Sequence, residues 1–442
     1  MIDIKYVKDN KIDLKKTIKN KNIDLDLDRL IELWDKKADF QRKLEKGNSE
    51  RNILSRKVKD STENERKSLI TKGVELKKNI AEINDKIKSL SAEFELLEIK
   101  VPTIPASDTP VGKSDAENQV INVWGEKPVF GFVPKTHIQI GEDLDIIDFV
   151  RGSKIGGYRG YYLKNEGVSL VMGIMMYAIS KMLQKGYSPM IPPTLVKEFV
   201  LFGSGYFKST TYDPGVDEIY QVATPDKNSL NEIDKEKRFL IGTAEPALLA
   251  YYSGEVLDES QLPMRLCGYS QCYRSEIGSY GKDTKGMYRV HEFMKVEQVI
   301  LCKADIVEAD KLQLEMVEIS KEMHEELGLP YRQLRICTGD MSPGKYKMFD
   351  IEAWMPGLDR YGETGSASNF VDWQSRRLNV RYQDQKKNKK YVYMLNNTAL
   401  PSPRVFISIL ENYQQKDGSI KIPKALWPFM PKGLKVIKKK ND

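Results

Sequence analysis

Apolar residues recur with a heptad spacing near the start of the chain, between residues 69 and 97. Two series seven residues apart interleave there, namely Leu69, Leu76, Ile83, Leu90 and Leu97, and Gly73, Ile80, Ile87 and Phe94. Together they form the a and d positions of a coiled-coil seam, with charged residues filling the other positions. The pattern therefore predicts one long amphipathic helix that packs against a partner helix.

The partner helix is predicted between about residues 27 and 58, where the same spacing is weaker. Leu33, Phe40 and Leu54 follow one series and Leu30, Leu44 and Val58 the other, with interruptions at Lys37, Gly47 and Arg51. The polar run 60–64 between the two halves is a natural turn. We expect an antiparallel helical hairpin over about residues 27–98, whose helices each span about 45 Å at about 1.5 Å per residue.

A second distinctive pattern lies between residues 265 and 301, which reads as two strands joined by a glycine-containing loop over 277–288. Alternation along a strand places Arg274 and Glu276 on one face of the first strand, and Arg289, Phe293 and Glu297 on one face of the second. Guanidinium groups bind phosphate, an aromatic face stacks on a purine, and carboxylates accept hydrogen bonds from amines. The alternative is an exposed hairpin held by ion pairs.

Three further segments give the chain its organisation. Residues 101–112, VPTIPASDTPVG, contain three prolines and predict a stiff linker between an N-terminal domain (1–100) and a larger domain (113–442). An apolar, methionine-rich helix is expected within 156–185. Residues 395–415 read as a strand followed by an amphipathic helix, with Arg404 near the helix start. A helix N-terminus beside an arginine suits an anion such as a phosphate.

Composition narrows the classes of protein. With 442 residues, 40% of them hydrophobic, the chain is long enough for two domains with a substantial core. It contains no uninterrupted apolar run of about 18 residues and its first residues lack a signal-peptide core, so we expect a cytoplasmic protein with no membrane partner. The four cysteines form no CxxC pair, which gives no support for zinc or disulfides.

A formal charge of +7 is modest for this length, so a nucleic-acid partner would require a local basic patch. The hairpin provides one, because residues 42–78 contain twelve Lys and Arg against six Asp and Glu. Such charge is most often only a solvated surface. Dispersed basic side chains on a rigid rod are nevertheless sufficient to hold the phosphates of a double-stranded RNA stem.

Several of these segments resemble the sequence motifs of one enzyme family. The run RSEIGSYGKDTKG (274–286) followed by RVHEFMKVE (289–297) resembles the second signature motif of class II aminoacyl-tRNA synthetases, in the version of seryl-tRNA synthetases. TAE at 243–245, SNFVDWQSRR at 368–377, the N-terminal hairpin and the proline-rich linker resemble the same family. Residues 186–198 look like its first motif and 395–415 its third. The resemblance implies an α+β fold: an antiparallel coiled-coil arm plus a catalytic domain with a mainly antiparallel sheet flanked by helices.

The resemblance also implies roles for individual residues. Arg274 would hold the ATP α-phosphate, Phe293 would stack on adenine, and Glu297 would accept the serine ammonium group. The implied catalytic residues are Arg274, Arg404 and Glu363. The implied ATP-binding residues are Arg274, Ser275, Glu276, Arg289, Val290, Phe293, Glu363, Thr364, Gly365, Ser366 and Arg404. The implied serine-binding residues are Thr243, Ala244, Glu245, Arg274, Glu297, Asn396 and Thr398, and Glu363 and Ser366 are the implied Mg²⁺ ligands. For Thr243 and Glu245, an ordinary helix start is the alternative.

The sequence differs from the family's usual motif residues at a few positions. Gly365 stands where a serine is usual, and Ala367 where cysteine is frequent. In the third motif Asn397 and Thr398 replace the usual Gly-Ser, and Pro401 and Pro403 replace small residues. A proline in the first turn of a helix is physically acceptable.

The function implied is the activation of L-serine with ATP and Mg²⁺, followed by transfer of serine to the 3′ end of tRNA(Ser), in a homodimer. Whether tRNA(Sec) is a second acceptor stays open. Two alternatives remain: a paralogue that loads an amino acid onto another carrier, and a catalytically impaired RNA-binding protein. The intact hairpin disfavours the first alternative, and the presence of both arginines, Glu363 and the TAE segment disfavours the second.

Overall fold

The computed structural model of the chain describes residues 3–225, 227, 231–233, 236–277 and 285–439. The chain divides into two compact units, Met1–Pro102 and Thr103–Asp442. Each unit has its own buried side chains, and the largest hydrophobic core draws all its members from the second unit.

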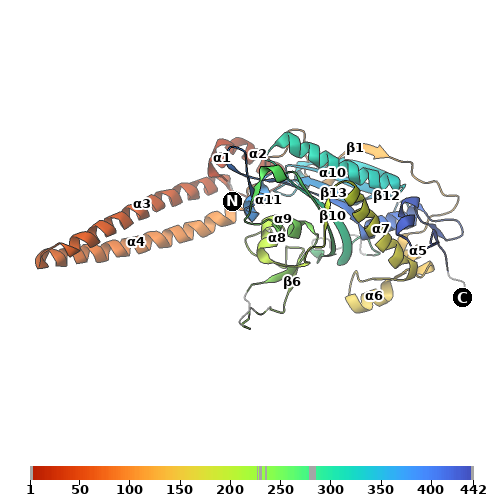
Figure 1. The fold of residues 1–442 in the computed structure, drawn as a ribbon, viewed down its shortest axis with the longest axis horizontal. Coiled ribbons are helices and arrows are strands. Elements are labelled where there is room, and N and C mark those ends of the chain that lie inside the picture. Colours follow the sequence, from red (N-terminus) through yellow and green to blue (C-terminus); the bar gives the residue numbers. More distant parts are fainter. Residues whose placement is uncertain (1–2, 226, 228–230, 234–235, 278–284, 440–442) are drawn as a thin grey trace. The chain divides into compact units, whose positions relative to one another are not determined.

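The first unit is built on the predicted helical hairpin. Helices α3 (Leu27–Lys59) and α4 (Glu63–Glu98) run antiparallel and side by side (Figure 1), after two short helices, α1 (Ile4–Asp9) and α2 (Lys11–Asn20). Thr62 and Glu65 form a capping box that starts α4 directly after the turn. The arm predicted from the heptads is confirmed.

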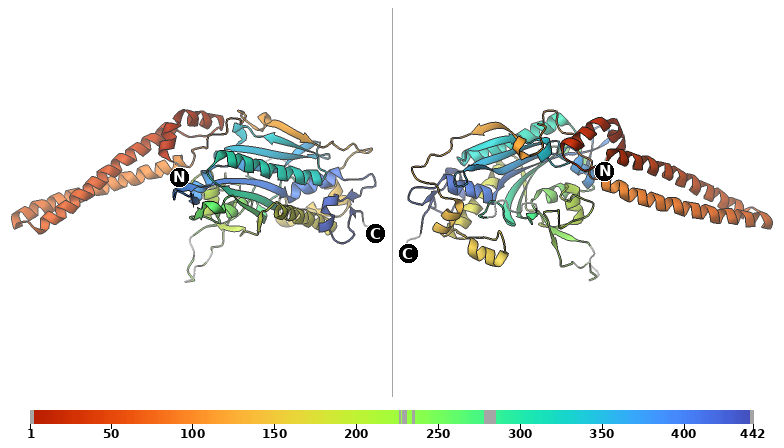
Figure 2. Two further views of the ribbon diagram at one scale, coloured as in Figure 1. Left: turned by 45° about the horizontal axis from the view of Figure 1, so that its top comes forward. Right: turned by 180° about the vertical axis from the view of Figure 1, so that it is seen from behind.

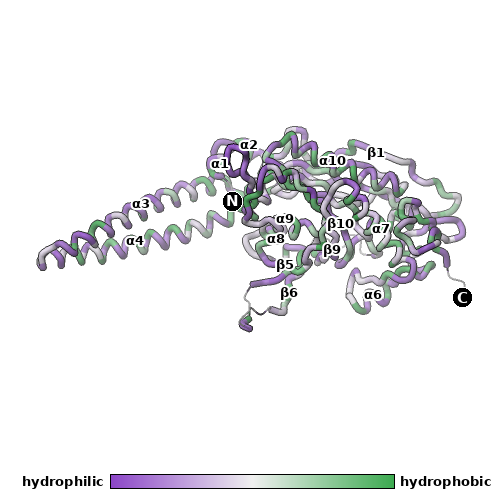
Figure 3. The backbone as a smooth tube through the Cα atoms, in the orientation of Figure 1, coloured by the Kyte–Doolittle hydropathy of each residue, from purple (hydrophilic) through white to green (hydrophobic). Residues whose placement is uncertain are grey.

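The interruptions in the first half of the seam have different explanations. Gly47 is buried, and a Cβ atom there would lie 3.2 Å from Ile80 Cγ1, so the glycine lets the two helices approach closely. The Lys37 ammonium lies 5.4 Å from the centroid of the Phe94 ring, so its aliphatic stem covers the seam while its charge stays near solvent. Arg51 is exposed. Figure 3 shows how hydrophilic the two helices are outside the seam.

The second unit is organised around an eight-stranded sheet in the order β1-β11-β12-β13-β16-β10-β9-β4. All neighbouring strands pair antiparallel except β4 with β9, which are parallel. The strands are β1 (Gln119–Trp124), β4 (Ser188–Met190), β9 (Met264–Tyr273), β10 (Glu292–Cys302), β11 (Tyr331–Arg335), β12 (Lys347–Met355), β13 (Arg360–Asn369) and β16 (Tyr393–Pro401). The predicted fold class, α+β with a mainly antiparallel sheet, is confirmed.

Side chains of β10 alternate between the two faces of the sheet, and each face packs in a different core. This alternation determines which face carries Lys295 and Glu297. Val296 and Ile300 belong to the large core, which also contains residues of α7 (Asn165–Gln184), α10 (Ile306–Glu326) and α12 (Ser402–Asn412). Val299 and Leu301 belong instead to a second core with α9 (Glu245–Ala250). Figure 2 shows α10 lying across the strands. Lys295 and Glu297 therefore point away from the α7, α10 and α12 layer.

Smaller elements complete the second unit. The remaining helices are α5 (His137–Asp143), α6 (Phe149–Gly156), α8 (Glu198–Ser204) and α11 (Trp373–Leu378). The short 3₁₀ turns are Asp115–Glu117, Glu259–Gln261, Thr338–Asp340 and Lys424–Phe429. The minor strands are β2 (Ile147–Asp148), β3 (Tyr162–Leu163), β5 (Leu195–Lys197), β6 (Tyr220–Val222), β7 (Arg238–Leu240), β8 (Val256–Asp258), β14 (Arg381–Gln383), β15 (Lys389–Tyr391), β17 (Ile420–Lys421) and β18 (Val436–Ile437).

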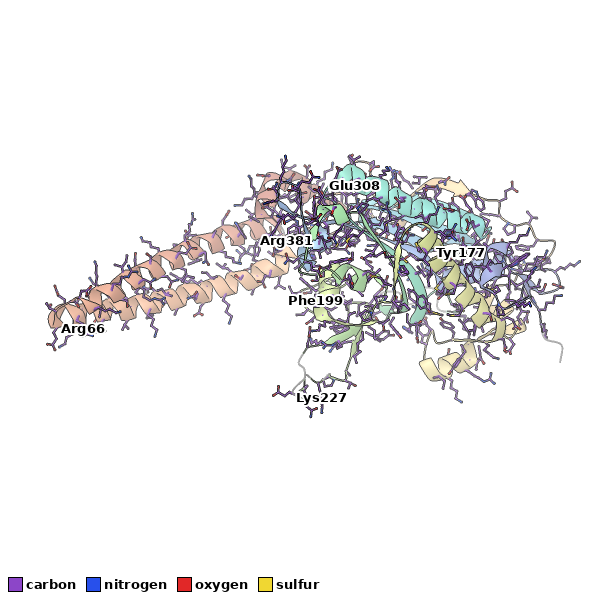
Figure 4. The ribbon with its side chains drawn as sticks, in the orientation of Figure 1. Arg66, Tyr177, Phe199, Lys227, Glu308 and Arg381 are labelled. Carbon is purple, nitrogen blue, oxygen red and sulfur yellow. The ribbon has the colours of Figure 1, made fainter. Side chains whose placement is uncertain are left out.

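The proline-rich run packs more closely than a free linker, and the apolar helix expected within 156–185 is present as α7. Residues 103–112 of the proline-rich run are held within the second unit, because Thr103 N–H donates to the Pro343 carbonyl and Ala106 N–H to that of Tyr346. Helix α7 is, among the described residues, the one helix long and apolar enough to cross a membrane. It packs in the large core, where Tyr177 (Figure 4) donates a hydrogen bond to Glu326 at 2.6 Å.

Candidate active site

The hairpin at the centre of the prediction has shorter strands than expected. β9 ends at Tyr273 and β10 begins at Glu292, so Arg274, Glu276 and Arg289 lie in the connecting segment and not on the strands. The strand-face argument for these three residues was therefore wrong, although Phe293 and Glu297 do lie on β10. Residues 278–284 of the predicted loop 277–288 lie outside the described residues. Glu276 has a φ of +54°, which turns the chain sharply after the strand.

The predicted residues nevertheless meet around one open cleft, whose space together with the solvent at its mouth is about 470 Å³. Its lining combines three arginines, one lysine, two carboxylates and two aromatic rings. The lining residues are Arg274, Glu276, Tyr288, Arg289, Val290, Phe293, Lys295, Glu363, Thr364, Gly365, Thr398, Pro401, Pro403 and Arg404. Nine of the eleven residues predicted to bind ATP are in this set, and Ser275 and Ser366 are the two that are not.

Both predicted phosphate-binding arginines are fixed by contacts to the backbone. Arg274 Nε donates to the Gly242 carbonyl at 3.1 Å, and its guanidinium carbon lies 5.4 Å from the centroid of the Phe293 ring. Arg404 Nη1 donates to the Glu363 carbonyl at 2.9 Å, and its guanidinium carbon lies 4.6 Å from the centroid of the Tyr288 ring. Side chains held in this way are already oriented for a ligand, which reduces the entropy lost on binding.

Two residues of the cleft, Tyr288 and Lys295, escaped the sequence analysis, as did Arg159, which contacts the lining residue Glu276. Arg159 follows α6, is almost fully buried, and its Nη1 lies 3.3 Å from Glu276 Oε2. Tyr288 accepts the Glu363 N–H on its hydroxyl group. Lys295 Nζ lies 2.5 Å from Glu297 Oε2. Tyr288 and Lys295 stand inside the quoted motif, where alternation with Phe293 and Glu297 could have identified Lys295. The lone arginine in GGYRG carries no comparable signal.

A bulge in β13 brings the two predicted Mg²⁺ ligands onto one face. Glu363 pairs with Glu352 and Ser366 pairs with Asp350, with a register shift between the two pairs. Because residues 350 and 352 share a face of β12, their partners Glu363 and Ser366 also share one, despite being three positions apart. In a regular strand they would point to opposite faces.

The oxygen atoms beside the bulge suit a hard divalent cation. Burial, opposed and outweighed by the positive charges of Arg404 and Arg274, leaves the pKa of Glu363 below its usual range, so this carboxylate is ionised. Burial and the charge of Glu363 raise the pKa of Asp350 well above its usual range. Asp350 Oδ1 is buried without a hydrogen-bond partner among the described atoms. Within the described chain, no group of three or more His, Cys, Asp or Glu side chains is placed to bind a metal.

A cluster of buried polar side chains beside the cleft, here called the serine pocket, contains Glu245, Glu297 and Asn396, three of the residues predicted for serine. Glu245, buried at the start of α9, accepts hydrogen bonds on Oε1 from Gln374 Nε2 at 2.8 Å and Asn396 Nδ2 at 2.9 Å. The hydroxyl group of Tyr206 donates to Oε2 at 3.3 Å. Burial, reinforced by the negative charge of Glu297, raises the pKa of Glu245 to about 7. Two carboxylates therefore share this pocket.

The neighbouring strand β16 divides its side chains between this pocket and the core. Asn396 contacts Glu245, and Thr398 Oγ1 donates to Glu297 at 3.4 Å and accepts from Lys295 at 3.3 Å. Asn397 points the other way, since its Nδ2 donates to the Met316 carbonyl and to Ser320 Oγ in α10. The departure from the family at Asn397 therefore does not touch the pocket, whereas the one at Thr398 does.

The TAE segment forms the helix start that was one of the two interpretations considered for it. Helix α9 begins at Glu245 with Ala244 as its N-cap, and Thr243 Oγ1 accepts the Glu245 N–H at 3.4 Å. Ala244 is fully buried and Thr243 nearly so. The segment is thus a helix start that also carries a buried carboxylate into the pocket.

Comparison with known proteins gives this arrangement a family. Residues 1–105 match the family model described as the seryl-tRNA synthetase N-terminal domain, and residues 227–413 match the tRNA synthetase class II core domain (G, H, P, S and T). The serine--tRNA ligase of Borrelia garinii subsp. bavariensis is 39% identical, with 96% of this chain and 97% of that protein covered. That of Treponema denticola is 38% identical, with 97% and 98% covered.

Solved structures agree in fold over the whole length. The crystal structure of seryl-tRNA synthetase from Pyrococcus horikoshii complexed with ATP has a TM-score of 0.86 and 32% identity, covering 100% of both chains. The cytoplasmic serine-tRNA ligase from Naegleria fowleri in complex with AMP has a TM-score of 0.82 and 29% identity, covering 97% of this chain and 96% of that one. Since the helical arm, the sheet and the arginine-lined cleft all lie within these matches, the chain belongs to the seryl-tRNA synthetase family.

Proposed function

We propose that this chain activates L-serine with ATP in the arginine-lined cleft and transfers the serine to the 3′ end of tRNA(Ser). The observation that carries the proposal is that the arginine-lined cleft lies next to the two buried carboxylates. Two fixed guanidinium groups and the Phe293 ring line it, and the carboxylates of Glu297 and Glu245 lie directly beside it. ATP and a small amino acid can therefore be held with their reacting groups adjacent.

In the first step, a carboxylate oxygen of serine attacks the α-phosphorus of ATP in line. A new P–O bond forms, the bond to the bridging oxygen breaks, and pyrophosphate leaves. Arg274 would neutralise the α-phosphate and Arg404, at the N-terminus of α12, the γ-phosphate. Phe293 would stack on adenine, and Glu276 would accept a hydrogen bond from the adenine or ribose. The serine carboxylate is already deprotonated, so this step requires positioning and charge neutralisation and no protein base.

Mg²⁺ fits the oxygen donors around the β13 bulge, where Glu363 and Ser366 would hold it beside the ATP phosphates. The unpartnered Asp350 Oδ1 on the opposite strand supports this assignment. A bound Mg²⁺ ion supplies additional neutralisation of phosphate charge. The protein contributes few ligands of its own, as expected where the phosphates provide the rest.

In the second step, a hydroxyl group of the terminal ribose of tRNA attacks the serine carbonyl carbon and AMP leaves. The helical arm would hold the body of the tRNA meanwhile. All twelve basic residues between 42 and 78 are exposed, and Arg66 is labelled on the distal part of the arm in Figure 4. A rigid rod with exposed positive charge suits phosphate contacts that do not depend on base sequence.

The direct test is serine-dependent exchange of labelled pyrophosphate into ATP by the purified full-length chain. The proposal expects exchange with serine and none with alanine, since a pocket built to bond a substrate hydroxyl discriminates by about 10⁴ or more. A chain that exchanges without serine, or not at all, contradicts it. Both alternatives weighed from the sequence, another carrier or a catalytically impaired protein, are disfavoured by full-length similarity to serine--tRNA ligases.

Glu297→Gln should weaken serine far more than ATP. A charge-assisted hydrogen bond to the serine ammonium is worth about 1.5 to 3 kcal/mol, so we expect the KM for serine to rise roughly ten- to a hundredfold. The KM for ATP, measured in the same exchange assay, should change less than about threefold.

The structure requires one control for this variant, because Glu297 also pairs with the buried Lys295. Removing the carboxylate alone leaves an uncompensated buried charge, which destabilises the fold. In the double variant Lys295→Met/Glu297→Gln that charge is absent. If the double variant regains the wild-type KM for serine, Glu297 stabilises the sheet and does not bind the substrate.

Serine binding should also depend on pH through Glu245. If the ionised carboxylate is the form that binds serine, a pKa of about 7 means that the KM for serine falls about tenfold from pH 6 to pH 8. Glu245→Gln should abolish this dependence. The pKa is raised in the fold, so this group's contribution to stability declines from pH ~4.5 to ~7 and is constant above. A wild-type KM for serine that stays flat over this range excludes the role.

We also propose that the chain forms a homodimer. Three apolar side chains of α7 spaced by one turn, Val168, Met172 and Met176, are 44%, 42% and 48% exposed. Sedimentation of the purified chain at micromolar concentration tests the dimer. Charging assays with tRNA(Ser) and tRNA(Sec) transcripts test whether the second tRNA is an acceptor.

A further inference from the structure

A buried histidine connects the third-motif helix to the far side of the cleft. His137 starts α5 and is 1% exposed, and Glu411 near the end of α12 is fully buried. His137 Nδ1 lies 2.9 Å from Glu411 Oε1, and His137 Nε2 lies 3.1 Å from the backbone nitrogen of Met287. Met287 directly precedes Tyr288 and Arg289, which line the cleft.

The hydrogen bonds determine the state of the ring. The Met287 N–H can only donate, so Nε2 must be unprotonated and accept. Nδ1 then carries the proton and donates it to Glu411, which also accepts the His137 N–H on the same oxygen. Glu411 Oε2 accepts the Gly357 N–H at 2.9 Å. Every partner is thus matched by direction, and the carboxylate is held at both oxygens.

Helix α12 also contacts residues 287–288 directly. Arg404 Nε donates to the Tyr288 carbonyl at 3.3 Å. Arg404 and Glu411 are seven positions apart on α12, about two turns, and so lie on one face of the helix. Gly286, with φ of +79°, makes the approach possible, because a Cβ there would lie 2.3 Å from His137 Nε2. The chain beside the cleft is therefore held by α12 directly and through His137.

We infer that His137 and Glu411 are positioning residues for the ATP site. They set the backbone at Met287 so that Tyr288 and Arg289 stay in register with Arg404. Neither residue lines the cleft. Their effect reaches the nucleotide through the Tyr288 carbonyl, which orients Arg404, and through Arg289, which lies 3.4 Å from Glu276. The serine pocket is formed by β16, α9 and Glu297, and none of the side-chain hydrogen bonds described for His137 and Glu411 reaches it.

Two substitutions of His137 separate its two ring hydrogen bonds, one with the Met287 N–H and one with Glu411. Glutamine can place its amide oxygen near the position of Nε2 and still accept the Met287 N–H. Asparagine can place its amide nitrogen near Nδ1 and still donate to Glu411, but it leaves the Met287 N–H buried without a partner. The two variants differ by one methylene and both remove the ring, so each controls for the other.

The inference rests on the proposed function, so the assay is serine-dependent pyrophosphate exchange with the full-length chain. We expect His137→Asn to raise the KM for ATP about tenfold, as for a lost buried hydrogen bond, and His137→Gln at most about threefold. The KM for serine should stay within about twofold of wild type in both. Equal effects of the two variants on ATP, or equal weakening of ATP and serine, would overturn the inference.

A second variant covers the case in which His137→Asn does not fold. Glu411→Gln keeps the size of the side chain, but its NH₂ group must face either the Gly357 N–H or the His137 Nδ1–H. We expect the KM for ATP to rise severalfold with serine unaffected, and an unchanged KM for ATP overturns the inference. If the wild-type chain shows no serine-dependent exchange, the proposed function itself fails, which is a separate outcome.

Discussion

Replacing Arg274 with alanine should reduce serine-dependent pyrophosphate exchange by at least about a thousandfold while the protein stays folded. The side chain touches the cleft through its guanidinium group and lies over the Phe293 ring, so the substitution removes a phosphate contact together with the support of the stacking residue. Losing one preorganised donor to a developing charge typically costs a factor of about 10²–10³, and the lost packing adds to this.

The same strand offers a matched control for this variant. Arg265, near the other end of β9, forms a bidentate pair with Glu315 of α10, at 2.8 and 2.9 Å, away from the cleft. Arg265→Ala removes the same side chain and should leave exchange within about threefold of wild type. Exchange by Arg274→Ala within about threefold of wild type would mean that the cleft is not the ATP site.

Shortening the arm should separate the two steps of the reaction. Replacing residues 40–90 with a short turn removes the distal hairpin, whereas the large core of the second unit contains no residue before Ile140. Serine-dependent exchange should therefore persist. Charging of tRNA(Ser) should fall by about 10³ or more, because binding through several phosphates carries most of the affinity in such complexes.

Charge and shape can be told apart with a milder variant of the arm. Changing the exposed Arg56, Lys57, Lys59, Arg66 and Lys67 to glutamine keeps both helices but removes five charges near the turn. Charging should weaken and the dependence of tRNA binding on salt between about 50 and 200 mM should become shallower. A shortened arm that charges tRNA as well as the full chain, or wild-type binding that ignores salt, would rule out the arm as an RNA-binding element.

The parts of the fold that the sequence predicted are those with a repeating pattern. The heptads identified both helices of the arm, since an a/d seam over many turns leaves no other periodicity that fits, and the polar run 60–64 located the turn between them. The interruptions of the seam in the first helix could be explained only from the structure. Gly47 reads as a break in the pattern, but the missing side chain is what lets Ile80 approach.

The sequence identified most of the residues that line the cleft, but not the geometry that brings them together. The strand ends at Tyr273, so Arg274 and Glu276 are placed by a turn whose φ at Glu276 is +54°. Alternation cannot reveal such a turn, nor the β13 bulge that aligns Glu363 with Ser366. Arg159 and His137 act through contacts far apart in the sequence, and single residues without a pattern give no sequence signal of that kind.

Successive side chains of strand β16 point to opposite faces of the sheet, and the two faces make unrelated contacts. Asn396 and Thr398 contact Glu245 and Glu297 in the proposed serine pocket, while Asn397 between them ties the strand to α10. A one-residue insertion or deletion here would exchange the two sets, sending the pocket's amide into the core and the core's amide into the pocket. A substitution therefore changes one of these contacts at a time, whereas an insertion or deletion would remove the contacts to Glu245 and Glu297 and the tie to α10 in a single mutation. Evolution along this segment should accordingly be a history of replacements, with gaps in family alignments falling outside residues 393–401.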